Sequence, residues 1–117
     1  MTRRIVAIVG TRFADFGIEE QILGPLNVEI RSGPGRTAEE LLAIAADADI
    51  VLAGGAPCFG AEVIAGLKAR GIVRYGIGVD TIDLEAARKA RMWVARVPDY
   101  GTQSVAFHSV TMALAAL

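Results

Sequence analysis

The chain has 117 residues, a length that accommodates one domain with a single hydrophobic core. Hydrophobic residues make up 53% of the sequence and aromatic residues only 6%, a composition typical of a parallel sheet covered by helices. A net charge of −1 excludes the basic footprint of a protein that binds nucleic acid or an anionic membrane. The lone cysteine, Cys58, excludes an internal disulfide and agrees with a cytoplasmic location.

Strand and helix patterns alternate along the chain. Short runs rich in β-branched residues predict strands at Ile5–Val9, Val28–Ile30, Ile50–Ala53, Val73–Tyr75 and Trp93–Val97. Helical patterns lie between them at Ile18–Leu23, Ala38–Ala46, Ala61–Lys68 and Leu84–Arg91. Thr37 and Glu40 form a capping box before the second helix. A helix between each pair of strands implies right-handed crossovers. We therefore expect an α/β fold: a five-stranded parallel sheet, flavodoxin-like in its order 2-1-3-4-5, with helices on both faces.

The last predicted helix, Val105–Leu117, has almost no polar face. A helix that is apolar all round is normally buried on all sides, and nothing in this sequence caps its end. The helix is too short to span a bilayer. The sequence therefore predicts a substrate-binding lobe at residues 1–101, the start of an interdomain crossover helix at 102–117, and a truncation after it. An isolated chain of this kind should form a homo-oligomer through the apolar helix.

Three predicted loops follow strand ends and carry glycines: Gly10–Phe13, Gly54–Pro57 and Gly76–Asp80. In an open parallel sheet, ligands bind outside the carboxyl ends of the strands. Successive glycines leave backbone N–H groups accessible to an anion, because no Cβ blocks the approach. The same glycines are also explained as tight strand exits, and the residues alone leave both interpretations open. A dinucleotide site is excluded at the third loop, which has neither a third glycine nor a suitably placed acidic residue after it.

The other side chains that could take part in chemistry are predicted to have structural and not catalytic roles. Asp83 is predicted to cap the helix that follows it, and Asp80 to stabilise the loop before it. His108 is the single histidine and has no carboxylate nearby in sequence to orient it as a base. Cys58 is interpreted as a small apolar residue. Without a cluster of cysteine and histidine residues, no metal site is expected.

Two motifs in the last part of the chain resemble a known family. The segments R-Y-G-I-G-V-D-T-I-D, from Arg74 to Asp83, and V-P-D-Y-G-T-Q-S-V-A-F-H, from Val97 to His108, are similar to the N-terminal, substrate-binding lobe of the D-isomer-specific 2-hydroxyacid dehydrogenases. Within this family, the residues of the two segments are most similar to the branch near the phosphoglycerate dehydrogenases and the C-terminal binding proteins. The resemblance is strong over about the last 44 residues and weak before them. It implies that the chain stops before the NAD-binding domain.

The resemblance also implies roles for individual residues. Backbone donors and one cation would bind a substrate carboxylate, at Gly54, Gly55, Ala56, Arg74, Gly76, Gly78 and Val79. Ile77, Thr102 and Val105 would border the cofactor, NAD or NADP, and no catalytic residue lies in this chain. Gly54-Gly55 stands where phosphoglycerate-type members often carry Arg-Ser, which implies a substrate without phosphate. Gly101 and Phe107 also depart from the residues that the family usually has at those positions.

The expected function is that of the substrate-binding lobe of an NAD(P)-dependent oxidoreductase. The whole enzyme would interconvert a small 2-hydroxy acid and its 2-oxo acid by hydride transfer, and the lobe alone would be inactive. The alternative is a stand-alone flavodoxin-like binding or regulatory module without dehydrogenase activity. Neither nucleic acid nor membrane is an expected partner.

Overall fold

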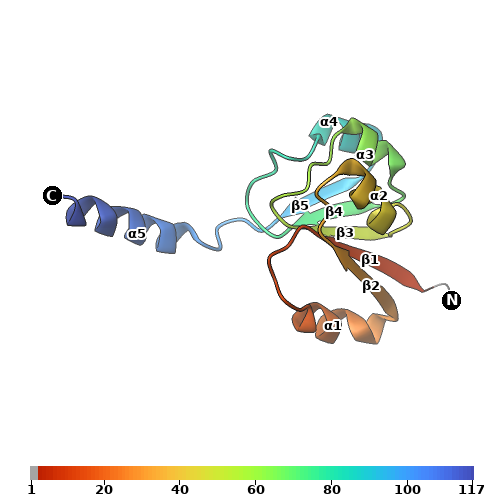
Figure 1. Ribbon diagram of the computed structural model, residues 1–117, viewed down its shortest axis with the longest axis horizontal. Helices are drawn as coiled ribbons and strands as arrows, with labels where there is room; N and C mark the ends of the chain where they lie inside the picture. The colour runs from red at the N-terminus through yellow and green to blue at the C-terminus, as the bar shows by residue number, and fades with distance from the viewer. Residues whose placement is uncertain (1–2) are drawn as a thin grey trace.

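Five parallel strands form one sheet in the order β2-β1-β3-β4-β5 in a computed structural model that describes residues 3–117 (Figure 1). The strands are β1 (Arg4–Val9), β2 (Val28–Gly33), β3 (Ile50–Ala53), β4 (Gly71–Arg74) and β5 (Trp93–Arg96). The helices are α1 (Gly17–Leu23), the 3₁₀ helix η1 (Gly24–Leu26), α2 (Ala38–Ala45), α3 (Ala61–Gly66), α4 (Leu84–Lys89) and α5 (Thr102–Ala115). The predicted fold class and strand order are confirmed.

Four strands differ from the predicted boundaries because backbone pairing, not side-chain type, sets their ends. β1 begins one residue early, at Arg4, which pairs with Val28. β2 continues past Ile30, since Arg31, Ser32 and Gly33 pair in register with the last three residues of β1. β4 begins at Gly71, which pairs with both neighbouring strands, and it ends before Tyr75. β5 ends one residue before the predicted Val97.

Helix ends differ in the same modest way. α3 stops before Lys68 because Leu67 adopts an extended conformation, with φ −92° and ψ 139°. α4 stops before Arg91, whose φ of 55° is left-handed and ends the helix. Only half of the predicted capping box forms: Thr37 Oγ1 accepts a hydrogen bond from the Glu40 N–H at 3.2 Å. The Glu40 carboxylate instead accepts the N–H of Arg36, at 2.8 Å.

The hydrophobic core lies between the sheet and the layer formed by α2, α3 and α4 (Figure 1). Its largest fully buried side chains include Phe59, Ile64 and Leu41. The predicted apolar face of α2 is correct in part. Leu41 and Ala45 are buried and Leu42 is half-buried, whereas Ala38 is exposed. This packed layer fixes the positions from which the loops at the carboxyl ends of the strands leave the sheet.

The opposite face of the sheet is covered incompletely. Helix α1 lies on that side (Figure 1) but has no buried residue. A groove of about 520 Å³ remains, with apolar side chains such as Leu26, Val28, Val73 and Trp93 along it. Trp93 is 80% exposed. Helices therefore lie on both faces as predicted, but only one face is sealed.

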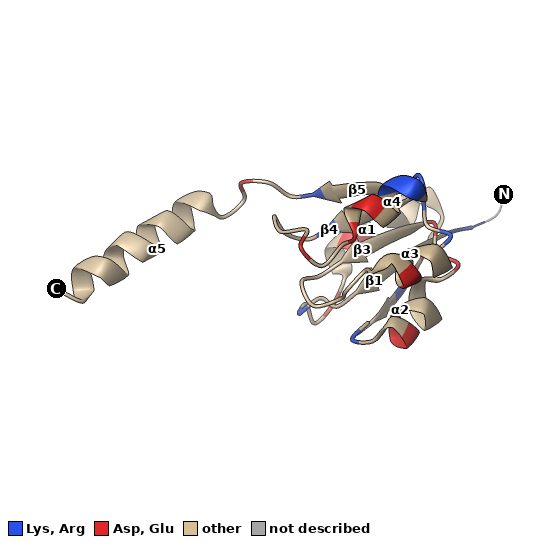
Figure 2. Cartoon of the chain, turned by 90° about the horizontal axis from the view of Figure 1, so that it is seen from above, with Lys and Arg blue, Asp and Glu red and all other residues tan. Residues whose placement is uncertain are grey.

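Helix α5 projects away from the sheet and from every other helix (Figure 1). It has no buried residue, and Figure 2 shows no charged residue along its length. The burial expected from its apolar sequence is therefore not supplied by the other residues of the described range, 3–117. Within residues 3–117, none of the helices combines the length and apolarity required to cross a membrane.

The amino-terminal strand is anchored by the carboxylate of Asp49. Its Oδ2 accepts the Ile5 N–H at 2.8 Å, and its Oδ1 accepts a hydrogen bond from Arg4 at 3.1 Å. The backbone N–H of Ile5, followed by Arg4, lowers the pKa of Asp49 below its ordinary value. A carboxyl with a lowered folded-state pKa stabilises the fold above its unfolded-state pKa, and this stabilisation disappears as the pH falls through the folded-state pKa.

We therefore expect Asp49→Ala to reduce the free energy of unfolding at pH 7 and to lose part of the acid dependence of stability below about pH 4. Urea denaturation at a series of pH values measures both effects. Glu62→Ala is the matched control, because the Glu62 side chain makes no hydrogen bond or ion pair within residues 3–117. If the free energy of unfolding of Asp49→Ala has the same pH dependence as that of the wild type, this role of Asp49 is contradicted.

Candidate functional site at the carboxyl edge of the sheet

A cavity of about 710 Å³ lies where the strands end at their carboxyl termini. It is lined by residues of the loops after β1, β2 and β3 and by residues at the end of β4 and beyond β5: Gly10, Thr11, Arg12, Phe13, Pro34, Arg36, Gly54, Gly55, Ala56, Arg74, Tyr75 and Tyr100. The predicted residues Gly54, Gly55, Ala56 and Arg74 thus come together in one cavity. This is the position at which open α/β sheets bind their ligands.

Gly54 holds two of these loops against each other. A Cβ at this position would collide with the carbonyl group of Gly10. The Gly54 N–H donates to the Val9 carbonyl at 2.8 Å, which extends the pairing of β1 and β3 by one bond. The prediction that Gly54 supplies a donor to substrate is therefore wrong, because that donor is already used. Its role is to permit the close approach of the two loops.

Arg74 lies across the glycines of the third and fourth strand exits. Ideal Cβ positions at Gly55 and Gly76 would be 3.3 and 3.0 Å from its guanidinium nitrogens. Its Nε is buried and has no hydrogen-bond partner, and the side chain makes no ion pair within residues 3–117. Arg74 as a whole is half-buried, and a partly desolvated cation without a partner favours the binding of an anion beside it. At the distances given, a side chain at Gly55 or Gly76 would require the guanidinium of Arg74 to move by a few tenths of an ångström.

Two glycine loops with free backbone N–H groups approach this cation, one at Gly55 and one at Gly76. Within residues 3–117, the N–H groups of Gly55, Ala56 and the segment 76–79 make no hydrogen bond. These groups follow β3 and β4, which are neighbours in the sheet. Unpaired backbone N–H groups next to a guanidinium suit a carboxylate, which has two oxygens that accept several bonds.

The other predicted contacts of the fourth loop are more dispersed. Ile77 is exposed, and its carbonyl accepts a hydrogen bond from Arg96 at 3.2 Å. Gly78 is exposed, whereas Val79 is half-buried against the core. Thr102 and Val105 lie on the projecting helix α5 and do not line the cavity. None of Ile77, Thr102 and Val105 lines the cavity, and their contact with a cofactor stays a prediction.

Tyr75 fixes one wall of the cavity. Its hydroxyl donates to Glu19 Oε1 at 2.6 Å, and its ring meets Phe13 edge to face at a centroid distance of 5.7 Å. Burial, and then the hydrogen bond to Glu19, raise the pKa of Tyr75 above its ordinary value. Tyr75 thus remains a neutral donor near pH 7. These contacts tie the loop after β1 and helix α1 to the end of β4.

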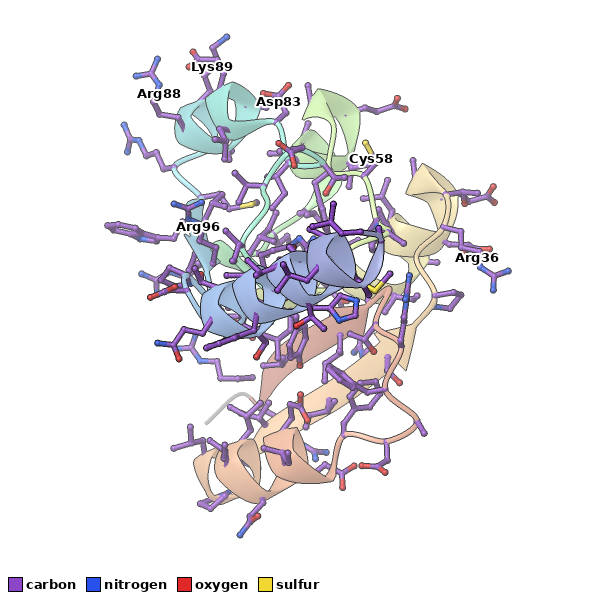
Figure 3. The ribbon with its side chains drawn as sticks, turned by 90° about the vertical axis from the view of Figure 1, so that its left-hand side faces the viewer. Arg36, Cys58, Asp83, Arg88, Lys89 and Arg96 are labelled. Carbon is purple, nitrogen blue, oxygen red and sulfur yellow. The ribbon has the colours of Figure 1, made fainter. Side chains whose placement is uncertain are left out.

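The residues with predicted structural roles lie outside this cavity. Asp83 Oδ1 accepts the Ala86 N–H at 2.9 Å, so the predicted helix cap is confirmed. Asp80 makes no side-chain hydrogen bond within residues 3–117, so no stabilising contact from it is seen. His108 is exposed on α5, and Cys58 is exposed on the surface (Figure 3). The described part of the chain contains no group of three potential metal ligands.

The sequence placed the loop Gly10–Phe13 at this edge without a role for Arg12, and it did not identify Arg36 as a cavity residue. Both follow strands that neighbour each other at one end of the sheet, β1 and β2. Figure 3 shows Arg36 and Arg96 on opposite sides of the carboxyl edge, with the projecting α5 between them in this view. The signal that would have found the pair is positional: basic residues that follow adjacent parallel strands meet at the same edge.

Comparison with known proteins decides the family. The profile of the D-isomer specific 2-hydroxyacid dehydrogenase catalytic domain matches residues 14–110. The chain belongs to this family. Among curated relatives, D-3-phosphoglycerate dehydrogenase of Mycobacterium leprae is 37% identical over 92 residues, and that of Methanocaldococcus jannaschii is 37% identical over 89 residues. These matches cover 76% and 75% of the chain but only 17% of each relative.

Solved structures show the same fold. The TT0316 protein from Thermus thermophilus has a TM-score of 0.81 at 27% identity, over 95% of this chain and 36% of that one. The NAD⁺-bound 3-phosphoglycerate dehydrogenase of Entamoeba histolytica has a TM-score of 0.72 at 27% identity, over 84% and 33%. The predicted family is therefore confirmed, and the family assignment favours a dehydrogenase domain over a flavodoxin-like regulatory module.

Proposed function

We propose that this chain is the substrate-binding lobe of an NAD(P)-dependent oxidoreductase that interconverts a small 2-hydroxy acid and its 2-oxo acid. The observation that carries the proposal is the unpaired, partly buried Arg74 guanidinium beside free backbone N–H groups, in a cavity at the carboxyl edge of the sheet. These donors match the one group that all such substrates share, the carboxylate. The names of the relatives support the same chemistry.

In this proposal the lobe binds and orients the acid substrate, and the cofactor provides the hydride. Arg74 and the N–H groups of Gly55 and Ala56 hold the carboxylate, so that C2 faces the open side of the cavity. Tyr75 and Phe13 form an apolar wall that limits water on one side. Fixing the acid in one orientation lowers the entropic cost of reaching the transition state.

The cofactor is NAD or NADP, and Ile77, Thr102 and Val105 are proposed to border it. The sequence contains no G-x-G-x-x-G loop, and we propose that a separate nucleotide-binding domain holds the dinucleotide phosphates. We propose a cytoplasmic enzyme that acts as a homo-oligomer on a free acid. The 117 residues alone should show no turnover. Submicromolar binding of NADH to them, measured by calorimetry, would show that the cofactor site is misplaced.

The test is turnover by the enzyme that carries this lobe, assayed with NADH, NADPH and a panel of 2-oxo acids. Arg74→Ala should lower kcat/KM by about tenfold to a hundredfold, because a charge-assisted hydrogen bond to the carboxylate is lost. Arg88→Ala is the control, since Arg88 pairs with Glu85 on α4. A folded sample that binds NADH but reduces no member of the panel would rule the function out.

A further inference from the structure

A second cavity, the rear chamber, lies behind the aromatic wall of the first. Its volume of about 410 Å³ is within the range of small-molecule sites, and it is lined by Phe13, Ala14, Asp15, Ile18, Glu19 and Tyr75. Phe13 and Tyr75 also line the first cavity, and within residues 3–117 no other residue lines both. Their rings, which meet edge to face with centroids 5.7 Å apart, therefore form the partition between the two cavities.

The two halves of this partition are held differently. Tyr75 follows β4 and is half-buried, and its hydroxyl donates to Glu19 Oε1 on α1 at 2.6 Å. Phe13 is 61% exposed in the loop between β1 and α1, which arcs from the sheet to the helix (Figure 1). A phenyl ring has no hydrogen-bonding group, and an edge-to-face contact alone is a weak restraint. Tyr75 is thus the fixed half of the partition, and Phe13 is the half that one substitution can remove.

The rear chamber favours an uncharged occupant. Ala14 and Ile18 contribute apolar surface to its lining, whereas Asp15 and Glu19 contribute carboxylates. Within residues 3–117, no lysine or arginine lines it. A second anionic group would therefore meet like charges without a compensating cation. A hydrocarbon tail would instead gain free energy by leaving water.

We propose that Phe13 is a specificity-determining residue, which closes the rear chamber and thereby limits the acid substrate to a short side chain. The inference rests on the proposed function, in which Arg74 and the N–H groups of Gly55 and Ala56 hold the carboxylate. Arg74 and Tyr75 are consecutive, so one small molecule can reach from the carboxylate site to the partition. With a small residue in place of Phe13, the two cavities join. The class of acid that then gains affinity is a monocarboxylic 2-oxo acid with a long, uncharged tail.

The test uses the 117-residue chain and backbone amide NMR titrations at constant ionic strength. The probes are pyruvate, 2-oxooctanoate and 2-oxooctanedioate, of which the last two have the same chain length and differ by a terminal carboxylate. The wild type should bind 2-oxooctanoate within about threefold of pyruvate, because the partition keeps the tail in water. Phe13→Ala should raise the affinity for 2-oxooctanoate by at least about tenfold, since burial of two methylene groups is sufficient for that factor. The amides of Ala14 and Ile18 should shift with this binding.

The charged probe and a second phenylalanine provide the controls. 2-Oxooctanedioate should gain less than about threefold from Phe13→Ala, because its terminal carboxylate would meet Asp15 and Glu19. Phe107→Ala removes the same ring from α5, outside both cavities, and should leave all three affinities within about twofold. The amide spectrum itself reports whether each variant is folded.

The role of Phe13 is refuted if Phe13→Ala leaves the affinity for 2-oxooctanoate unchanged, or if 2-oxooctanedioate gains equally. A gain without shifts at Ala14 and Ile18 also refutes it, because the tail then lies elsewhere. If pyruvate shifts no amide of the glycine loops while 2-oxooctanoate still shifts Ala14 and Ile18 in Phe13→Ala, the rear chamber stands and the proposed function fails. If no acid shifts any amide in either protein, both fail.

Discussion

Replacing Gly54 by alanine should reduce the free energy of unfolding by about 3 kcal/mol or more, the largest effect we expect from a single methyl group in this chain. The added Cβ would collide with the carbonyl group of Gly10, which is backbone and cannot rotate out of the way. To relieve the collision, β1 and β3 must separate at their carboxyl ends. That movement breaks the bond from Gly54 N–H to Val9 and opens the floor of the cavity.

Thermal and urea denaturation measure this effect, and the melting temperature should fall by about 10 °C or more. Gly24→Ala is the control, because a Cβ there meets no atom within 4 Å and the residue already has helical angles. That substitution should be neutral or stabilise the fold by up to about 1 kcal/mol. Equal melting temperatures for the two variants would show that the loops after β1 and β3 are not closely packed in solution.

The 117-residue chain should associate into dimers or larger particles through α5. The helix has no charged side chain and no buried residue, and Phe107 and Leu114 are 75% and 65% exposed. Burying five or six apolar side chains contributes roughly 1.5–3 kcal/mol each. That gain exceeds what is needed for association at micromolar concentration. The most favourable arrangement is one in which the helices of two chains pack together.

Light scattering and sedimentation at micromolar concentration should report more than one chain per particle. Leu114→Glu should shift the population toward the monomer, because a carboxylate cannot be buried at the contact without a partner. Gln103→Glu adds the same charge in the first turn, where the helix dipole tolerates it, and should leave the particle size unchanged. A monodisperse wild-type monomer would refute association through α5.

The sheet could be predicted from sequence because its signals are local. Each strand is a short β-branched run that ends near Gly, Pro or Asp, and a helix between successive strands leaves few possible orders. Strand ends could not be predicted as well. β2 extends to Gly33 and β4 begins at Gly71 because their neighbours supply hydrogen bonds, and these partners are distant in sequence.

The candidate site was predictable in part for the same reason. The glycine loops and Arg74 carry recognisable patterns, and the structure brings most of them to one cavity. That Gly54 is a spacer and not a donor depends on its contact with Gly10, which lies far earlier in the chain. Arg12 and Arg36 belong to no motif, so only the adjacency of β1 and β2 reveals them. The residues of α5 show that the helix is apolar. They do not show whether another part of the protein packs against it.

The incompletely covered face of the sheet gives this protein an intrinsic optical reporter. Trp93 is the single tryptophan, and it borders the apolar groove on that face with most of its ring in water. Its fluorescence should therefore resemble that of a solvated indole and be quenched readily by acrylamide. Any segment or partner that settles on the groove would shift the emission to shorter wavelengths and protect it from the quencher. Occupation of that face can thus be followed without attaching a label.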